Sequence, residues 1–318
     1  SRLFWLVGQS VTTRDGTCEG YGTTFAVFAD GYVGRDMNGR DKQDIRLRAV
    51  PLDVSQFLKR NLWSKAPSTT MISATLRDYT DGSFRFLKRS LGLNSEAKEV
   101  VVSSPFNFSQ QMLIHLTDGA RQDMAEIRGA RFSIGELKNL INASSGRSLV
   151  LFTSIAELEY VAAELRTDKA FKYPLLVQEK GADKAYLATR FKEDTDSVLL
   201  ASKTFFQGFD VPGESLTSLI MCKYSLPQYN ATTIALINHW KKQGFPKWYE
   251  MKSIETFVQA WGRLIRSDGC RGVVSLLDYR VSDPKESIYK TVHAVIPAVY
   301  GGVEVTGDVE RVQEWLDS

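Results

Sequence analysis

From about residue 100 onward, short continuous apolar runs alternate with longer amphipathic segments. Apolar runs of this kind are typical of strands buried on both faces, and the amphipathic segments have the period of helices. Strands are expected at Ser148–Phe152, Tyr173–Val177, Ser197–Ala201, Leu216–Met221 and Gly272–Leu277. Helices are expected at Ser109–Leu116, Ser133–Ala143, Ile155–Arg166 and Lys184–Glu193, with a helix-rich stretch at Asn230–Ser267. This alternation predicts an α/β domain with a mainly parallel sheet flanked by helices.

The first fifty residues differ from the rest of the chain. Leu3–Val7 and Thr23–Phe28 are rich in strand-forming residues, and Asp44–Val50 alternates apolar and charged residues with period two. This pattern predicts a small antiparallel meander or hairpin with one face in water. We expect residues 1–50 to be the end of a preceding domain or a hairpin extension, and residues 51–318 to form the main domain.

Charge and composition exclude several classes of protein. The 318 residues carry 40 Lys and Arg against 37 Asp and Glu, and a net charge of +3 permits a nucleic-acid partner without requiring one. Three scattered cysteines are too few for a disulfide framework or a four-cysteine iron–sulfur site, and three histidines form no HExxH motif. We therefore expect no metal site and no iron–sulfur cluster in this chain. With no signal peptide and no membrane-spanning apolar run, we expect a cytoplasmic location, nucleoid-associated in a bacterium, with the nucleus left open.

The segment from Glu255 to Gly269 is the strongest candidate for a functional site. On a helix, Gln259, Arg263 and Arg266 would lie at i, i+4 and i+7 and so share one face. Gly262 would leave room beside them. Two guanidinium groups on one stripe suit a polyanion such as a nucleoside triphosphate, although a solvated basic helix face would look the same. The opposite, buried face would be formed by Phe257, Val258, Leu264 and Ile265.

Three further segments carry weaker signals. Lys203–Gly213 follows a buried strand and would lie at the carboxyl edge of the sheet, where open α/β folds bind ligands; an ordinary loop is the alternative. Met71–Leu76 ends an apolar run with small hydroxyl residues. Leu149–Ser154 is a strand whose terminal hydroxyls could cap the next helix or bind phosphate.

Complete sites of familiar kinds are missing from the sequence. Glycine is nowhere followed by lysine, so no phosphate loop occurs, and no Asp-Glu pair stands at a strand end to hold magnesium. A nucleophile elbow and a dinucleotide fingerprint are also missing.

The order of the candidate segments resembles motifs III to VI of superfamily 2 helicases. The matching blocks are Ser73–Leu76, Ser104–Phe108, Leu151–Ser154, Phe206–Gly213 and Gln259–Arg266. The Ser-Pro-Phe-Asn-Phe block and the Phe-x-Gly-x-Asp-Val-Pro-Gly loop resemble the DinG/XPD-like branch. Gln207 and Phe209 depart from the Glu-Gly-Val-Asp sequence that is more usual there. The resemblance covers roughly residues 45–280.

The resemblance implies that residues 51–318 are a second RecA-like domain, the half of a helicase motor that lacks the phosphate loop. ATP and Mg²⁺ would be shared with a preceding RecA-like domain. Arg263 and Arg266 would then act as arginine fingers on the γ-phosphate, and Gln259 would help to order it. The nucleotide cleft would be lined by Asp210, Gly208 and Gly262. Contacts to single-stranded DNA, or to RNA, would come from Thr153, Ser154, Thr204, Ser73 and Thr75.

On this interpretation the chain is the C-terminal motor half of an ATP-dependent DNA helicase and should not hydrolyse ATP alone. Two alternatives from other classes stay open. One is a non-catalytic RecA-like module that binds nucleic acid or docks a protein. The other is an α/β transferase that uses a nucleotide sugar, which would have no need for paired arginines at a domain boundary.

Overall fold

Two compact units make up the computed structural model, and each is described by itself. The first contains described residues of Ser1–Val101 and of Leu226–Lys252, and the second those of Val102–Ser225 and Ser253–Ser318. The expected domain division between residues 50 and 51 stays a prediction. The structure describes residues 11–12, 17–20, 23–35, 41–94, 96–119, 124–179, 181–202 and 214–318.

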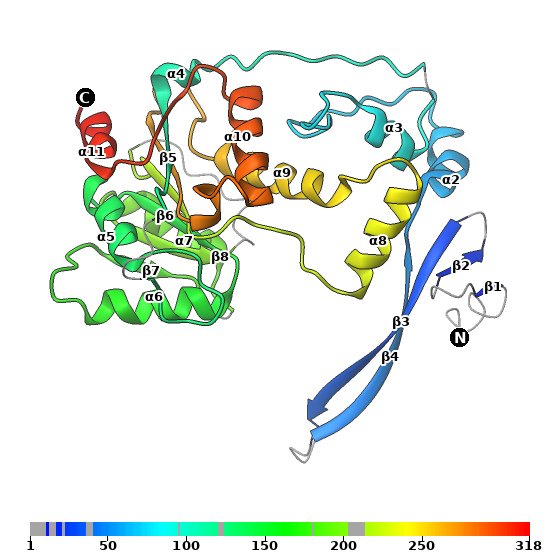
Figure 1. Ribbon diagram of the computed structural model, residues 1–318, viewed down its shortest axis with the longest axis horizontal. Helices are drawn as coiled ribbons and strands as arrows, with labels where there is room; N and C mark the ends of the chain where they lie inside the picture. Colours follow the sequence, from blue (N-terminus) through cyan, green and yellow to red (C-terminus); the bar gives the residue numbers. More distant parts are fainter. Residues whose placement is uncertain are drawn as a thin grey trace. The chain divides into compact units, whose positions relative to one another are not determined.

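The second unit is built on a seven-stranded sheet in which every pair of neighbouring strands is parallel (Figure 1). The strand order is β11-β5-β10-β9-β6-β8-β7. The sheet confirms the predicted parallel α/β architecture. The strands are β5 (Met112–Leu116), β6 (Ser148–Phe152), β7 (Leu175–Val177), β8 (Val198–Ser202), β9 (Ser218–Met221), β10 (Gly272–Leu276) and β11 (Glu304–Thr306).

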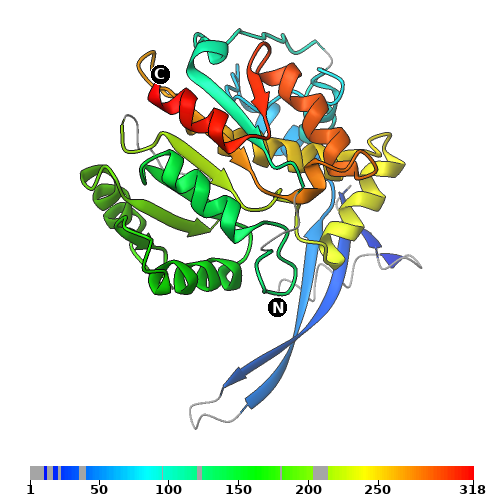
Figure 2. The same ribbon diagram turned by 60° about the vertical axis from the view of Figure 1, so that its left-hand side comes forward.

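Helices lie on both faces of this sheet (Figures 1 and 2). Right-handed crossovers place α5 and α6 on one face, and α7, α9 and α10 on the other, because the two sets connect strands in opposite directions across the sheet. α11 packs on α5. The helices are α4 (Phe108–Gln111), α5 (Ile134–Ala143), α6 (Ile155–Thr167), α7 (Lys184–Glu193), α9 (Trp248–Trp261), the 3₁₀ turn η3 (Tyr279–Val281), α10 (Ser287–Val299) and α11 (Val309–Asp317).

The core of the second unit uses both faces of every central strand. Leu113, Ile220 and Val273 belong to one cluster with side chains of α5, α6 and α11. The alternate residues Ile114 and Leu219 are just as fully buried. Strands buried on both faces show no period-two alternation, which explains their continuous apolar sequences.

One element differs in type from the sequence prediction. Ser109–Leu116 was expected to be a helix, but only the short α4 is helical, and Met112–Leu116 forms strand β5. Every residue of β5 is buried, and it pairs with β10 on one side and β11 on the other. Pairing with a strand on each side therefore outweighs the local helix propensity of a Gln-Met-Leu sequence.

The first unit contains an antiparallel sheet in the order β1-β2-β3-β4, which confirms the predicted meander. The predicted strand Leu3–Val7 lies outside the described residues. A small core forms around Phe86 and Trp240, whose rings meet edge to face at 4.9 Å. Among the described helices, none is both long and apolar enough to cross a membrane. The elements are β1 (Val11–Thr12), β2 (Thr17–Gly20), β3 (Thr23–Arg35), β4 (Asp41–Pro51), α2 (Ser55–Leu58), the π-helical turn η1 (Lys59–Trp63), α3 (Arg85–Leu91) and α8 (Ala231–Lys242).

Candidate functional site

The two candidate arginines lie on a turn that follows α9. The helix ends at Trp261, so the prediction of a helical stripe that continues to Arg263 and Arg266 was wrong. The N–H of Gly262 makes the last i→i−4 bond, 2.9 Å to Val258, and the next two N–H groups bond only three residues back. Glycine is a poor helix former, which favours the end of the helix here. Leu264 and Ile265, which follow it, are buried.

The end of α9 is fixed by a chain of aromatic contacts. The rings of Phe257 and Trp261 lie 4.1 Å apart, and Trp261 is 5.8 Å from Tyr300 on the other side. Tyr300 in turn meets Phe108, the last residue of the Ser-Pro-Phe-Asn-Phe block, at 5.3 Å. Two of the sequence blocks therefore pack against the same side chain, although about 150 residues of chain separate them.

Gln111 braces the loop that follows the arginines, a role that sequence reasoning missed. Its side-chain amide donates to the carbonyl oxygens of Ser267, Asp268 and Cys270 at 3.0 to 3.1 Å. The amide is buried at the start of β5, so it links this loop to the sheet. In the sequence, Gln111 is only a glutamine directly before an apolar run, and this pattern does not indicate which groups its amide contacts.

The turn lies beside the amino end of β10, where a Cβ on Gly272 would be 3.0 Å from Leu264 Cδ1. Gln259 and Arg263 are half-buried and Arg266 is exposed. A Cβ at Gly262 would meet only the Val258 carbonyl oxygen, at 3.3 Å, so the surface above this glycine is open. At the strand itself the packing is tight, since a Cβ on Gly272 would lie 2.3 Å from the Thr217 carbonyl oxygen. The segment that carries the arginines therefore leads into a tightly packed start of β10.

Thr153 and Ser154 occupy the opposite end of the strands, directly after β6. Ser154 is the N-cap residue of α6, but its side chain makes no capping hydrogen bond. Ser133, at the same position of α5, does cap its helix by accepting from the N–H of Glu136 at 3.2 Å. The capping explanation for Ser154 therefore does not apply, and its hydroxyl is available for another partner.

Ion pairs tie the carboxyl ends of neighbouring strands together. Lys223, after β9, donates to the Gly129 carbonyl oxygen at 2.8 Å and lies 3.4 Å from the buried carboxylate of Glu157 on α6. Asp278, after β10, accepts from Arg280 Nε at 2.8 Å and from the N–H of Tyr224 at 3.0 Å. Sequence reasoning missed these residues, although Lys223 and Asp278 each stand two positions after a buried strand.

The structure does not test the remaining candidates. Thr204, Gly208 and Asp210 lie outside the described residues. Ser73 and Thr75 belong to the first unit, where the Ser73 hydroxyl accepts from the N–H of Thr75 at 3.2 Å in a local turn. Within the described ranges, no cluster of three or more His, Cys, Asp or Glu side chains could hold a metal ion.

A half-buried acid and a buried base lie at the carboxyl end of β5. His115 Nε2 is 3.6 Å from Glu136 Oε1, and the Thr117 hydroxyl donates to Glu136 Oε2 at 2.9 Å. Burial raises the pKa of Glu136 from 4.5 to about 7, and burial lowers the pKa of His115 from 6.5 to about 4. The carboxyls of Asp118 and Asp308 also face this pair: Asp118 acts on both groups, and Asp308 acts on His115.

The two groups should have opposite effects on stability. Between pH 4.5 and 7, folded Glu136 keeps a proton that the unfolded chain releases, so stability falls as pH rises. Between pH 4 and 6.5, unfolded His115 binds a proton that the folded state does not, so stability rises with pH. We expect urea denaturation of Glu136→Gln to show stability that increases by about 3 kcal/mol over that window, against a flatter wild-type profile. Parallel profiles would contradict this assignment.

Comparison with known proteins decides the family. A profile described as the helicase C-terminal domain matches residues 137–295, which is half of the chain. The chain belongs to this helicase family. It is 30% identical over 253 residues to "ATP-dependent DNA helicase YoaA" of Haemophilus influenzae, covering 77% of this chain and 37% of that protein. It is 29% identical over 248 residues to "Probable ATP-dependent helicase YpvA" of Bacillus subtilis, covering 78% and 36%.

The DinG/XPD-like branch is also confirmed. The chain is 27% identical over 249 residues to "3'-5' exonuclease DinG" of Bacillus subtilis, covering 76% of this chain and 26% of that protein. A solved XPD helicase has the same fold, with a TM-score of 0.52 at 15% identity over 82% of this chain and 46% of the other. This helicase domain therefore spans only 26–37% of the length of the three named relatives.

Proposed function

We propose that this helicase domain is the second RecA-like half of an ATP-dependent DNA helicase, and that it supplies two arginine fingers. The observation that carries the proposal is the turn bearing Arg263 and Arg266, which the aromatic contacts of Trp261 and the amide of Gln111 hold in place. Donors fixed before the reaction stabilise developing charge without reorganisation, which is what phosphoryl transfer requires. The full protein would work in the cytoplasm on nucleoid DNA if its source is bacterial.

The nucleotide would be bound jointly with another RecA-like domain. Backbone N–H groups and the lysine of a phosphate loop hold the β- and γ-phosphates in such motors, and carboxylates beside it hold Mg²⁺. That loop would come from the other domain. In this chain Gln259 would order the γ-phosphate, and Gly208, Asp210 and Gly262 would line the cleft. The isolated chain would then bind ATP weakly and not hydrolyse it.

Single-stranded nucleic acid would bind at the carboxyl ends of the strands. Thr153 and Ser154 directly precede the first residue of α6, and a helix N-terminus favours a phosphate. Thr204, Ser73 and Thr75 would add contacts to the same single strand of nucleic acid. One of the named relatives is a DNA helicase, so DNA is the preferred ligand, with RNA as the alternative.

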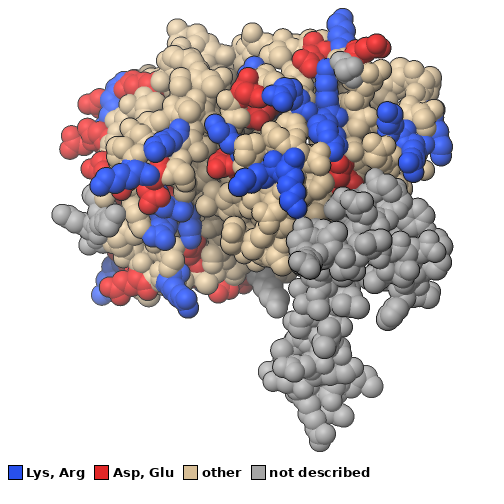
Figure 3. Space-filling model, turned by 45° about the vertical axis from the view of Figure 1, so that its right-hand side comes forward, with Lys and Arg blue, Asp and Glu red and all other residues tan. Residues whose placement is uncertain are grey.

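Binding to single-stranded DNA should be weak and should depend modestly on salt. On the face shown in Figure 3, basic side chains are interspersed with acidic ones, so few phosphates can be neutralised there. Each phosphate contact contributes about −0.7 to the slope of log affinity against log salt. We expect a slope of roughly −1 to −3 in fluorescence anisotropy, with no preference for one sequence.

A matched pair of variants separates strand binding from helix capping. Ser154→Ala should weaken DNA binding severalfold and leave the melting temperature unchanged, because its hydroxyl does not cap α6. Ser133→Ala should do the reverse and cost about 1 kcal/mol, because that hydroxyl does cap α5. Equal DNA affinity in wild type and Ser154→Ala would contradict the proposed contact.

A further inference from the structure

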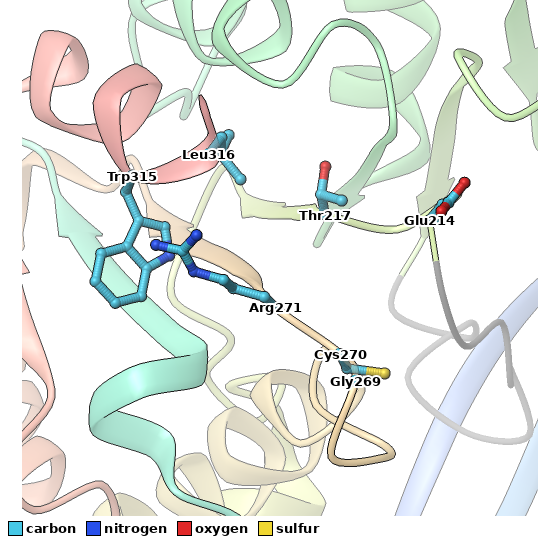
Figure 4. A pocket seen from close by; sticks show the side chains of 7 residues that line it. All are labelled: Glu214, Thr217, Gly269, Cys270, Arg271, Trp315 and Leu316. Atoms are coloured by element: carbon cyan, nitrogen blue, oxygen red, sulfur yellow. The ribbon is translucent and has the colours of Figure 1, made fainter. Parts of the chain in front are cut away.

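A small pocket opens at the amino ends of β9 and β10, apart from the strand ends that carry Thr153 and Ser154. Its volume is about 210 Å³. One wall is the loop Gly269–Arg271 before β10, and another is the last turn of α11 with Trp315 (Figure 4). Thr217 and Glu214, which precede β9, complete the lining. The volume suits a group of a few non-hydrogen atoms.

The indole of Trp315, one of the residues that line this pocket, carries a buried donor. The side chain is 9% exposed, and within the described part of the chain its Nε1–H has no hydrogen-bond partner. A buried tryptophan N–H usually has one, since leaving it unpaired costs roughly 1–3 kcal/mol. An acceptor supplied by a ligand would remove that cost.

Arg271 places a guanidinium group beside the same indole. Its Cζ lies 4.3 Å from the centre of the Trp315 ring system, so the guanidinium is held over the indole by a cation–π contact. Its Nη2 donates to the Ser318 hydroxyl at 2.7 Å. A guanidinium has five N–H donors, and those not used by Ser318 can serve a planar or tetrahedral oxyanion.

We propose that this pocket binds a small oxyanion, a carboxylate or a phosphate group, through Arg271 and the indole N–H of Trp315. Both groups are donors, and the guanidinium carries the positive charge that an oxyanion requires. Figure 4 shows Glu214 well separated from Trp315, so the acidic side chain does not occupy the donor end of the pocket. Its charge nevertheless favours a ligand with a single anionic group. The proposal is independent of the helicase function.

The indole resonance of Trp315 offers a direct test. Each of the six tryptophans gives one indole N–H cross-peak in a ¹⁵N–¹H NMR spectrum of the full chain, and Trp315→Phe assigns the relevant one. Sodium acetate and inorganic phosphate are titrated separately at constant ionic strength, with sodium chloride as the balance. We expect the Trp315 peak alone to move saturably, with a Kd of roughly 1–10 mM for the better anion. The better of the two probes tells a carboxylate ligand from a phosphate ligand.

Variants decide whether Arg271 is the anchor. Arg271→Met should abolish the shift, and Arg271→Lys, which keeps the charge but loses the planar fork, should weaken it at least threefold. Arg311 lies on α11 together with Trp315, but it pairs with Glu304 and Glu314. The variant Arg311→Met should therefore respond like wild type. No saturable shift with either anion, or an unchanged shift in folded Arg271→Lys and Arg271→Met, would overturn the proposal.

Discussion

Replacing Arg263 or Arg266 by alanine in the full-length helicase should reduce DNA-stimulated ATP hydrolysis by about 10³–10⁵-fold. Arg263 lies on the turn that follows α9 and Arg266 just after it, and in the proposed function both side chains contact a nucleotide held by another domain. Their charge would stabilise the γ-phosphoryl group as it is transferred. Because Arg266 is exposed and Arg263 half-buried, the melting temperature should change little in either variant.

The control for charge alone is lysine at the same positions. Arg263→Lys and Arg266→Lys keep the positive charge but lose the planar fork, so neither should restore turnover. Arg166→Ala, an exposed arginine on α6 that pairs with Glu179, should hydrolyse ATP like wild type. If both alanine variants at the turn also retained near-normal turnover, the basic side chains would be a solvated surface and not fingers.

Asp278→Ala should cause the largest loss of stability, about 3–5 kcal/mol in urea denaturation. The carboxylate is fully buried and accepts from the Arg280 guanidinium and from the N–H of Tyr224. Removing it leaves a guanidinium that is only 15% exposed without its counter-charge, and a buried N–H without its acceptor. The segments after β9 and β10 would lose the hydrogen bond between the N–H of Tyr224 and Asp278 that links them.

Two further variants test this explanation. Asp168→Asn removes an ion pair with Lys138 near the surface, and its urea denaturation midpoint should stay close to that of the wild type. Asp278→Ala combined with Arg280→Met removes both charges and should recover part of the loss, since no unpaired charge stays buried. A cost below about 1 kcal/mol for Asp278→Ala alone would show that the pair does not hold the strand ends together.

The sequence predicts the parallel sheet well because most of its buried strands are visible as short apolar runs in the sequence itself. Continuous apolar runs such as Ser148–Phe152 read directly as buried strands, and Lys184–Glu193 matches α7 at both ends. The prediction for β5 was wrong for the same reason. An inner strand that is buried on both faces shows no hydrophobic period, and the two strands that pair with β5 lie far along the chain. Local signals do not distinguish such a strand from a buried helix.

The sequence names candidate residues for the site, which stay predictions, but it does not predict how the chain is arranged around them. The order of the motifs identified Arg263 and Arg266, yet the end of α9 at Trp261 depends on a glycine and on burial of Leu264. The brace from Gln111 reaches carbonyl groups 156 residues or more away, and a glutamine alone gives no sign of such partners. Contacts of this kind arise only when the fold brings distant segments together.

ATP turnover by residues 1–318 alone, compared with the full-length protein under the same conditions, tests the central claim most directly. Single-turnover assays with single-stranded DNA should show no hydrolysis by the isolated chain and clear DNA-stimulated hydrolysis by the full protein, because the phosphate loop would belong to the other domain. The opposite result would be turnover by the isolated chain that persists through further purification and disappears in Asp210→Ala. That result would contradict a shared nucleotide site, and a full-length protein without any ATPase activity would instead favour the non-catalytic docking module.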